Sequence, residues 1–119
     1  MEQVRKLIYF KHYFHNFFDK QTDKVKDKID YVLYLLTVVD RIPTKFIEHL
    51  KGTDGLYEIR IEFESNIYRV FCCFDEGKIV VLFNGFQKKS QKTPPNELEM
   101  ALKIKKEYFD FKNSGHENK

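Results

Sequence analysis

The segment that decides the fold runs from Leu56 to Phe86 and reads LYEIRIEFESNIYRVFCCFDEGKIVVLFNGF. Apolar and polar residues alternate along most of it, which is the pattern of strands with one buried face. The dipeptides Ser65-Asn66 and Glu76-Gly77 interrupt this alternation with residues typical of tight turns. The pattern therefore predicts three antiparallel strands, over residues 56–64, 67–75 and 78–87.

The sequence before these strands has the spacing of helices. Apolar residues three and four apart predict an amphipathic helix over residues 22–39, with Thr22 as its N-cap. A shorter helix over 12–18 should pair with it as a helical hairpin that covers the apolar face of the sheet. Residues 4–10 read as a further strand that joins the sheet. Pro43 is suited to the first turn of a short helix that ends near Leu50.

The C-terminal part predicts one more helix and then a tail. Thr93 is the expected N-cap, Pro94 the first helical position, and Leu98, Ala101, Leu102, Lys105, Tyr108 and Phe109 the inner stripe. Residues 113–119 are polar and should form a flexible C-terminal tail. We therefore expect a single α+β domain over residues 1–112, with an antiparallel sheet, an N-terminal helical hairpin on one face and a C-terminal helix.

Strand register brings distant charged residues onto one face. If both turns have two residues, Glu62 lies opposite Arg69, and Arg69 lies opposite Asn84. Arg60 and Phe86 then share this face, and Lys88 joins it if the last strand continues. The other face carries the predicted core, which consists of Ile59, Ile61, Phe63, Tyr68, Val70, Cys72, Phe74, Ile79, Val81 and Phe83.

The stretch that follows the last strand is rich in lysine. Between Gly85 and Pro94 the chain carries Lys88, Lys89 and Lys92 together with the aromatic Phe86. Phosphate binds point positive charge, and a nucleobase stacks on a flat ring, so this combination favours RNA or another polyanion. A solvated basic loop and an ordinary cross-strand ion pair between Glu62 and Arg69 explain the same residues, and the pattern leaves these interpretations open.

Composition and charge exclude several classes of protein. The chain has 119 residues, of which 42% are hydrophobic, and this fits one folded domain rather than a disordered chain. Its net charge of +3 is small, so a basic surface must arise from the arrangement of residues. No apolar run reaches the length of a membrane span, and the N-terminus does not resemble a signal peptide. We therefore expect a cytoplasmic protein that does not bind membranes.

Neither the cysteines nor the histidines predict a metal or cofactor site. Cys72 and Cys73 are adjacent in a strand, so their side chains should point to opposite faces and act as small apolar residues. His12 and His15 have the spacing of one helical turn, but no third ligand completes a set. We predict no metal and no cofactor.

Several short motifs, in order, resemble a known family. They are Leu50-Lys51-Gly52, Gly55-Leu56-Tyr57-Glu58-Ile59-Arg60, Ile67-Tyr68-Arg69-Val70, Phe74-Asp75-Glu76-Gly77-Lys78, Gly85-Phe86-Gln87-Lys88-Lys89 and Gln91-Lys92-Thr93-Pro94. Together they resemble the HigB-type, phage-derived branch of the RelE/ParE toxin superfamily over residues 50–108. The resemblance implies a RelE-like fold and a toxin of a type II toxin–antitoxin system.

The resemblance also implies roles for individual residues. Arg60 and Arg69 match family arginines, and Phe86, Lys88, Lys89 and Lys92 match the Gly-Phe-x-Lys-Lys run and the lysine before Thr-Pro. Asn84 departs from the pattern, because relatives often carry a histidine there. As catalytic residues we predict Arg60, Arg69, Glu62 and Lys88; as substrate-binding residues we predict Phe86, Lys89, Lys92 and Asn84. Which group is the acid and which the base stays open.

The expected activity is ribosome-dependent cleavage of mRNA by attack of the ribose 2′-hydroxyl, without a metal, which would inhibit translation. The expected partners are a helix-turn-helix antitoxin, in a complex that can be of higher order, and the ribosome with its mRNA. Two alternatives remain: a non-enzymatic ParE-like toxin that binds gyrase, and an inactive interaction domain with the same fold.

Overall fold

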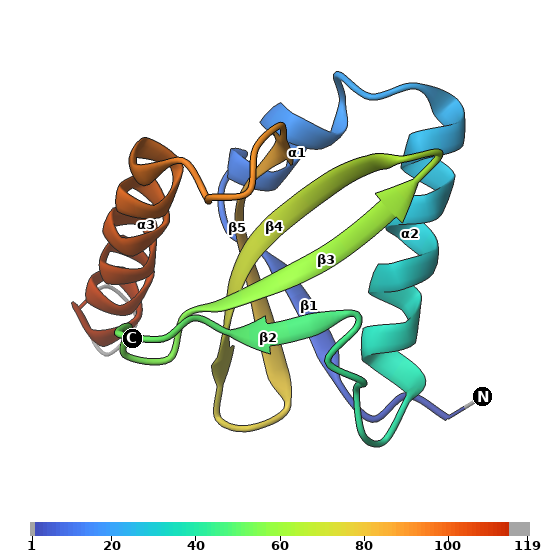
Figure 1. Cartoon of the computed structure of the whole chain (residues 1–119). Helices are drawn as coiled ribbons and strands as arrows, with labels where there is room; N and C mark the ends of the chain where they lie inside the picture. The colour runs from blue at the N-terminus through green and yellow to red at the C-terminus, as the bar shows by residue number, and fades with distance from the viewer. Residues whose placement is uncertain (1, 115–119) are drawn as a thin grey trace.

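A computed structural model of the chain describes residues 2–114 and contains a five-stranded mixed sheet (Figure 1). The elements in chain order are β1 (Lys6–Tyr9), α1 (Tyr13–Phe18), α2 (Asp23–Val38), β2 (Ile47–His49), β3 (Tyr57–Phe63), β4 (Asn66–Asp75), β5 (Ile79–Lys88) and α3 (Pro95–Ser114). The strand order is β1-β5-β4-β3-β2. The predicted α+β class is confirmed, and the arrangement is consistent with a RelE-like fold.

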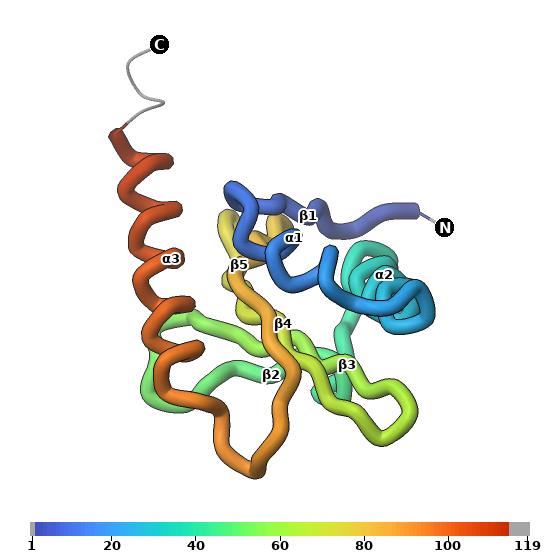
Figure 2. Tube along the Cα trace, turned by 90° about the horizontal axis from the view of Figure 1, so that it is seen from above, coloured from blue at the N-terminus to red at the C-terminus, as the bar shows by residue number. Residues whose placement is uncertain are grey.

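The first two helices cover one face of the sheet, as predicted. Thr22 caps α2, because its Oγ1 accepts a hydrogen bond of 3.3 Å from the backbone N of Val25. The buried stripe of α2 packs with Phe14 and Phe17 of α1 against the apolar residues of β3, β4 and β5. Figure 2 shows α1 and α2 together on the side of the sheet that faces away from α3.

The second face of the sheet is also covered in part, by α3, which rests on Cys73, Val81 and Phe83. Two details of the predicted helix were wrong. It begins at Pro95, because the carbonyl of Pro94 accepts the first helical bonds, from Glu97 N and Leu98 N. Ile104 is buried, whereas Leu102 is 42% exposed, so the inner stripe follows the spacing 101, 104, 108. No helix in the described part of the chain is long and apolar enough to cross a membrane.

Three further expectations need correction. The sheet is not purely antiparallel, because β1 pairs with β5 in parallel orientation. The region predicted as a short helix after Pro43 contains only a turn and then β2, whose three residues pair with the edge of β3. Finally, α3 continues through Asn113 and Ser114, which were assigned to the tail; residues 115–119 lie outside the described residues.

The strand register differs from the predicted one because of the turns and a bulge. Glu64 and Ser65 both have positive φ, 50° and 70°, which places the two-residue loop one position earlier and pairs Phe63 with Asn66. Arg60 therefore lies opposite Arg69, and Glu62 opposite Ile67. Between β4 and β5 the register shifts by a bulge between Val70 and Cys72. The turn before β5 also includes Lys78, so Asp75 pairs with Ile79; Val80 and Leu82 therefore lie on the face covered by α1 and α2, whereas Ile79, Val81 and Phe83 lie on the α3 face.

A buried polar network attaches α3 to the end of β4. Asp75 accepts a hydrogen bond of 2.7 Å from the Tyr108 hydroxyl, and both of its oxygens lie 2.8 Å from Lys112 Nζ. Burial would raise the pKa of Asp75, but the hydrogen bonds from Lys112 and Tyr108 outweigh it and hold that pKa below its usual value. Burial and the bond to Asp75 raise the pKa of Tyr108 to about 12.

We predict that Asp75 makes folding sensitive to acid. Because the pKa of Asp75 is lowered in the folded state, its ionised carboxylate stabilises the fold fully at pH values above the ordinary Asp pKa of about 3.9. This contribution is lost as the pH falls through the lowered pKa of the folded state. Asp75→Asn should lower stability near neutral pH and flatten the stability profile in that acid window. Urea unfolding at a series of pH values measures this; Asp54→Asn, at an exposed aspartate in a loop, is the matched control. Parallel profiles for Asp75→Asn and the wild type would contradict it.

Gly85 allows α1 to lie close to β5. A Cβ at this position would come within 2.5 Å of Phe17 Cδ2 and 2.8 Å of its Cγ. The Phe17 ring is itself buried in the core beneath α1, with Tyr68 as a neighbour at 6.3 Å between ring centroids. The absence of a side chain at Gly85 therefore fixes the distance between the helical hairpin and the sheet.

We predict that Gly85→Ala destabilises the protein by about 1–3 kcal/mol, the usual cost of an overpacked core. Since the clash is with one ring, Phe17→Leu should recover part of this loss when it is combined with Gly85→Ala. Denaturant unfolding of both single variants and the double variant measures the coupling. Additive effects of the two substitutions would show that Phe17 does not set the constraint.

Candidate functional site

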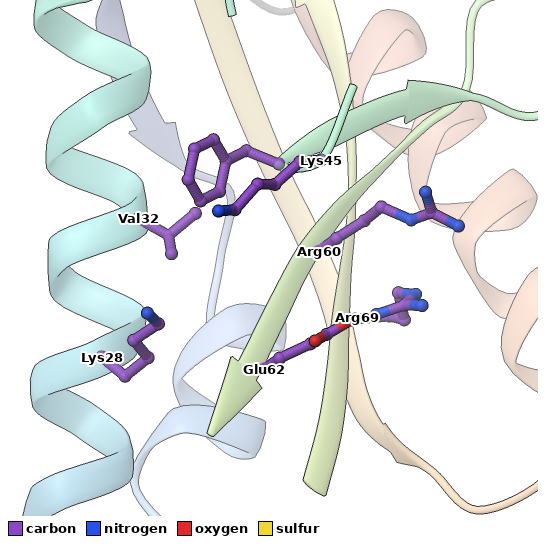
Figure 3. Close-up of a pocket in the computed structure, with 7 residues that line it drawn as sticks. Lys28, Val32, Lys45, Arg60, Glu62 and Arg69 are labelled. Carbon is purple, nitrogen blue, oxygen red and sulfur yellow. The ribbon is translucent and has the colours of Figure 1, made fainter. Parts of the chain in front are cut away.

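Three of the predicted catalytic residues line one pocket at the edge of the sheet. Arg60, Glu62 and Arg69 surround a cavity of about 470 Å³, together with Lys28, Val32, Lys45 and Phe46 (Figure 3). The pocket exists because β2 is short. Its pairing with β3 ends at Ile59, and one further bond joins Arg60 N to the Phe46 carbonyl at 2.8 Å.

The two arginines occupy directly opposite positions on β3 and β4. They lie on the same face, as the sequence predicted, although the exact partner predicted for Arg69 was Glu62. Two like charges in this position repel each other, so the pair costs stability unless a carboxylate lies between them. Glu58 provides that carboxylate, two residues before Arg60 on the same face of β3.

Glu58 is buried, with 3% of its surface exposed, and contacts both arginines. Its Oε1 lies 3.3 Å from Arg69 Nε and 3.8 Å from Arg60 Nε. Its Oε2 accepts a hydrogen bond of 3.3 Å from Thr93 Oγ1, just ahead of α3. Glu58 therefore offsets part of the charge of the arginine pair and connects the pocket to the segment just before α3.

The two arginines have different environments. Arg69 is 5% exposed and donates from Nη1 to the Tyr68 carbonyl at 3.2 Å. Burial lowers its pKa, which the charge of Glu58 opposes only in part. Arg60 is more accessible and also pairs with Glu48, whose Oε1 lies 3.1 Å from Arg60 Nη1. Arg60 can exchange this exposed partner for a ligand, while Arg69 is held in place.

The hydrogen-bonding capacity of the pair is not used up by the protein. Neither Arg60 Nε nor Arg69 Nε has a hydrogen-bond partner among residues 2–114, although both nitrogens are buried. The contacts of these nitrogens with Glu58 are close in distance but not aligned as hydrogen bonds. Guanidinium groups bind phosphate through two parallel hydrogen bonds, so two adjacent arginines with spare donors form a suitable phosphate site.

Other predicted residues lie elsewhere. Lys88 shares a face with Phe86 near the end of β5, and it lines a second hollow of about 670 Å³ with Lys89 and the turn at Asn66. Lys92 is exposed in the loop before α3. The lysine-rich segment therefore lies beside the pocket and does not line it.

Two predicted substrate-binding residues are buried and serve the fold in this structure. Phe86 is 7% exposed and stacks on Phe71 with ring centroids 5.6 Å apart, so its ring is not open to a nucleobase. Asn84 Nδ2 donates to the carbonyl and to Oε1 of Glu97, both at 3.1 Å. Asn84 thus holds α3 against β5. Its buried Oδ1 has no partner within residues 2–114.

Sequence reasoning missed five residues of the site: Glu58, which contacts both arginines, and Lys28, Val32, Lys45 and Phe46, which line the pocket. The sequence could have indicated Glu58, because alternate residues of a strand share a face and Glu58 therefore lies on the same face as Arg60 and Glu62. Lys28 lies within α2, and Lys45 and Phe46 come just before β2, so only the packing of α2 beside β3 brings them to the pocket. Within residues 2–114, no group of three histidine, cysteine, aspartate or glutamate side chains could hold a metal ion.

We predict that Glu58 stabilises the folded protein chiefly because it provides a negative charge beside the buried guanidinium of Arg69. Glu58→Ala should destabilise the protein by about 3–5 kcal/mol, because it leaves a buried guanidinium without its counter-charge. Adding Arg69→Met should restore much of that loss. Urea unfolding of the two single variants and the double variant gives the coupling energy. Glu62→Ala, at an exposed carboxylate on the same strand, is the control and should change stability by less than about 0.5 kcal/mol. Equal effects of Glu58→Ala and Glu62→Ala would contradict this assignment.

A family model matches the sequence over most of the elements described above. The sequence model of the family described as "Phage derived protein Gp49-like (DUF891)" matches residues 16–106, from α1 to the middle of α3. None of the curated proteins matches the chain. The matched range includes all the residues that line the pocket beside β3. The chain therefore belongs to the family of Gp49-like phage-derived proteins.

Proposed function

We propose that this protein is a HigB-type toxin of a type II toxin–antitoxin pair and that it cleaves mRNA on the ribosome. The observation that carries the proposal is the arginine pair, Arg60 and Arg69, opposite each other in a pocket at the edge of β3. Membership of a phage-derived family and an α+β fold consistent with RelE-like proteins support it. The lysines beyond β5 supply further positive charge along the same side of the sheet.

The reaction we propose is transesterification within the RNA. The 2′-oxygen of a ribose attacks the adjacent 3′-phosphorus, the bond from phosphorus to the 5′-oxygen breaks, and a 2′,3′-cyclic phosphate and a 5′-hydroxyl result. Negative charge grows on the non-bridging oxygens in the transition state. Arg60 and Arg69 stabilise that charge, because their guanidinium groups are positioned before the substrate arrives.

Two proton transfers complete this reaction. Glu62 is the carboxylate that lines the pocket, and it is exposed, so we assign it to accept the proton of the 2′-hydroxyl. Lys88 lies on the same face, two residues beyond Phe86, which pairs with Arg69. We assign Lys88 to donate a proton to the leaving 5′-oxygen. Glu58 takes no part in proton transfer, because it is buried between the arginines.

The basic pocket at the edge of β3 also indicates what kind of inhibitor would bind the protein. A toxin with a basic pocket at an open sheet edge needs an inhibitor that covers or distorts it. We propose a helix-turn-helix antitoxin that contributes acidic groups, and assembly into a higher-order complex with it. Action on translating ribosomes places the protein in the cytoplasm.

We predict that Arg60→Ala slows cleavage of mRNA on translating ribosomes by about two orders of magnitude or more, the usual loss when one such donor is removed. Arg69→Lys should also be slow, since a lysine keeps the buried charge but cannot form two parallel hydrogen bonds. The measurement is the rate at which new 5′ ends appear on a defined message. The reaction should proceed in a chelator that removes transition metals and leaves the Mg²⁺ that ribosomes need, because every step above is assigned to side chains.

Arg41→Ala is the matched control, because Arg41 is an exposed arginine outside the pocket. It should cleave at the wild-type rate. Cleavage by Arg60→Ala at the rate of Arg41→Ala would remove the arginine pair from the mechanism. Inhibition of gyrase supercoiling by a wild-type protein that cuts no message would favour the ParE-like alternative.

A further inference from the structure

The pocket beside β3 has a second cationic side that the proposed reaction does not use. Lys28 projects from α2, and Lys45 precedes β2; Figure 3 shows both between α2 and β3, with the guanidinium of Arg60 pointing away from them. Phe46, which follows Lys45, lines the same pocket and is only partly buried. These three residues, Lys28, Lys45 and Phe46, are called the α2-side subsite below.

In the described part of the chain, the two lysines of the α2-side subsite have no acidic partner. Across residues 2–114 neither forms an ion pair with a carboxylate, whereas Arg60 pairs with Glu48 and Arg69 with Glu58. The Lys28 ammonium instead lies 5.5 Å from the centroid of the Tyr31 ring, and that of Lys45 lies 5.4 Å from the Phe46 ring. The charge of these lysines is therefore available to an external anion.

The position of the subsite selects the kind of anion. A lone phosphate would be satisfied by the arginine pair. A polynucleotide carries a phosphate at each nucleotide, so a strand that crosses the unpaired edge of β3 presents a second phosphate to the α2 side. The Phe46 ring gives a base a surface on which to stack, and stacking of this kind is largely independent of base identity.

We propose that Lys28, Lys45 and Phe46 bind the nucleotide adjacent to the one held at Arg60 and Arg69, in a single-stranded RNA that crosses the open edge of β3. This inference rests on the proposed function for the choice of RNA. The ligand is single-stranded, because the complementary strand of a duplex would shield the base from Phe46.

The test is RNA binding in the absence of ribosomes. The probe is a short fluorescein-labelled single-stranded RNA with a methyl group on every 2′-oxygen, which cannot be cleaved by 2′-attack. Fluorescence anisotropy at several salt concentrations gives the slope of log affinity against log salt. The double variant Lys28→Ala/Lys45→Ala should bind more weakly, with a slope shallower by about 0.7, the value for one lost phosphate contact on a single strand.

Two controls separate local contacts from total charge. Lys103→Ala removes an exposed lysine of α3, outside the pocket, and should leave the slope unchanged. Lys28→Arg/Lys45→Arg keeps both charges and should retain the wild-type slope.

Phe46→Leu tests the stacking contact. It keeps an apolar residue in the core and should weaken binding without changing the slope, because stacking releases no counterions.

The outcomes distinguish this inference from the proposed function. Equal slopes and affinities for Lys28→Ala/Lys45→Ala and the wild type would overturn the subsite, and so would an equal loss in Lys103→Ala. If the wild type binds the probe through these lysines but cuts no message on ribosomes, the proposed cleavage fails and the subsite stands.

Discussion

Two guanidinium groups lie opposite each other across β3 and β4, and the carboxylate of Glu58 lies close to both. Without Glu58, the repulsion between Arg60 and Arg69 would destabilise the pairing of β3 and β4 at the point where the pocket forms. A buried carboxylate is costly to desolvate, and its contacts with the two guanidinium groups offset part of that cost. The pocket therefore depends on one residue that does not line it.

The rest of the fold determines which part of the sheet remains accessible. The α1–α2 hairpin covers one face and comes close to β5 because Gly85 has no side chain. On the other face α3 covers the ends of β4 and β5, where Asp75 and Asn84 attach it. The region around Arg60 and the unpaired edge of β3 stay open as a pocket. The short β2 pairs with that edge only up to Ile59, so the pocket lies where the pairing between β2 and β3 ends.

Local patterns predicted the elements well, because each carries its own signal. The alternation in residues 56–86 and the cap at Thr22 are examples, and strand parity placed Arg60 and Arg69 on one face. Register was not predictable, since the positive φ of Glu64 and the bulge near Phe71 depend on how the twisted strands meet. Phe86 was assigned to stacking because it is an aromatic residue in a lysine-rich run, but α3 and Phe71 bury it. Lys28 and Lys45 reach the pocket only through tertiary packing.

Under the proposed function, Arg60 and Arg69 bind one phosphate together through Nε–H groups that have no hydrogen-bond partner within residues 2–114. The most direct measurement is a nuclear magnetic resonance titration that follows the Nε–Hε signals of both arginines as 2′-O-methylated RNA is added. If the pair binds one phosphate, the two signals should shift at the same RNA concentration, in the direction of stronger hydrogen bonding. A shift of Arg60 alone, or of neither arginine while other signals respond, would show that the pair does not form a phosphate site.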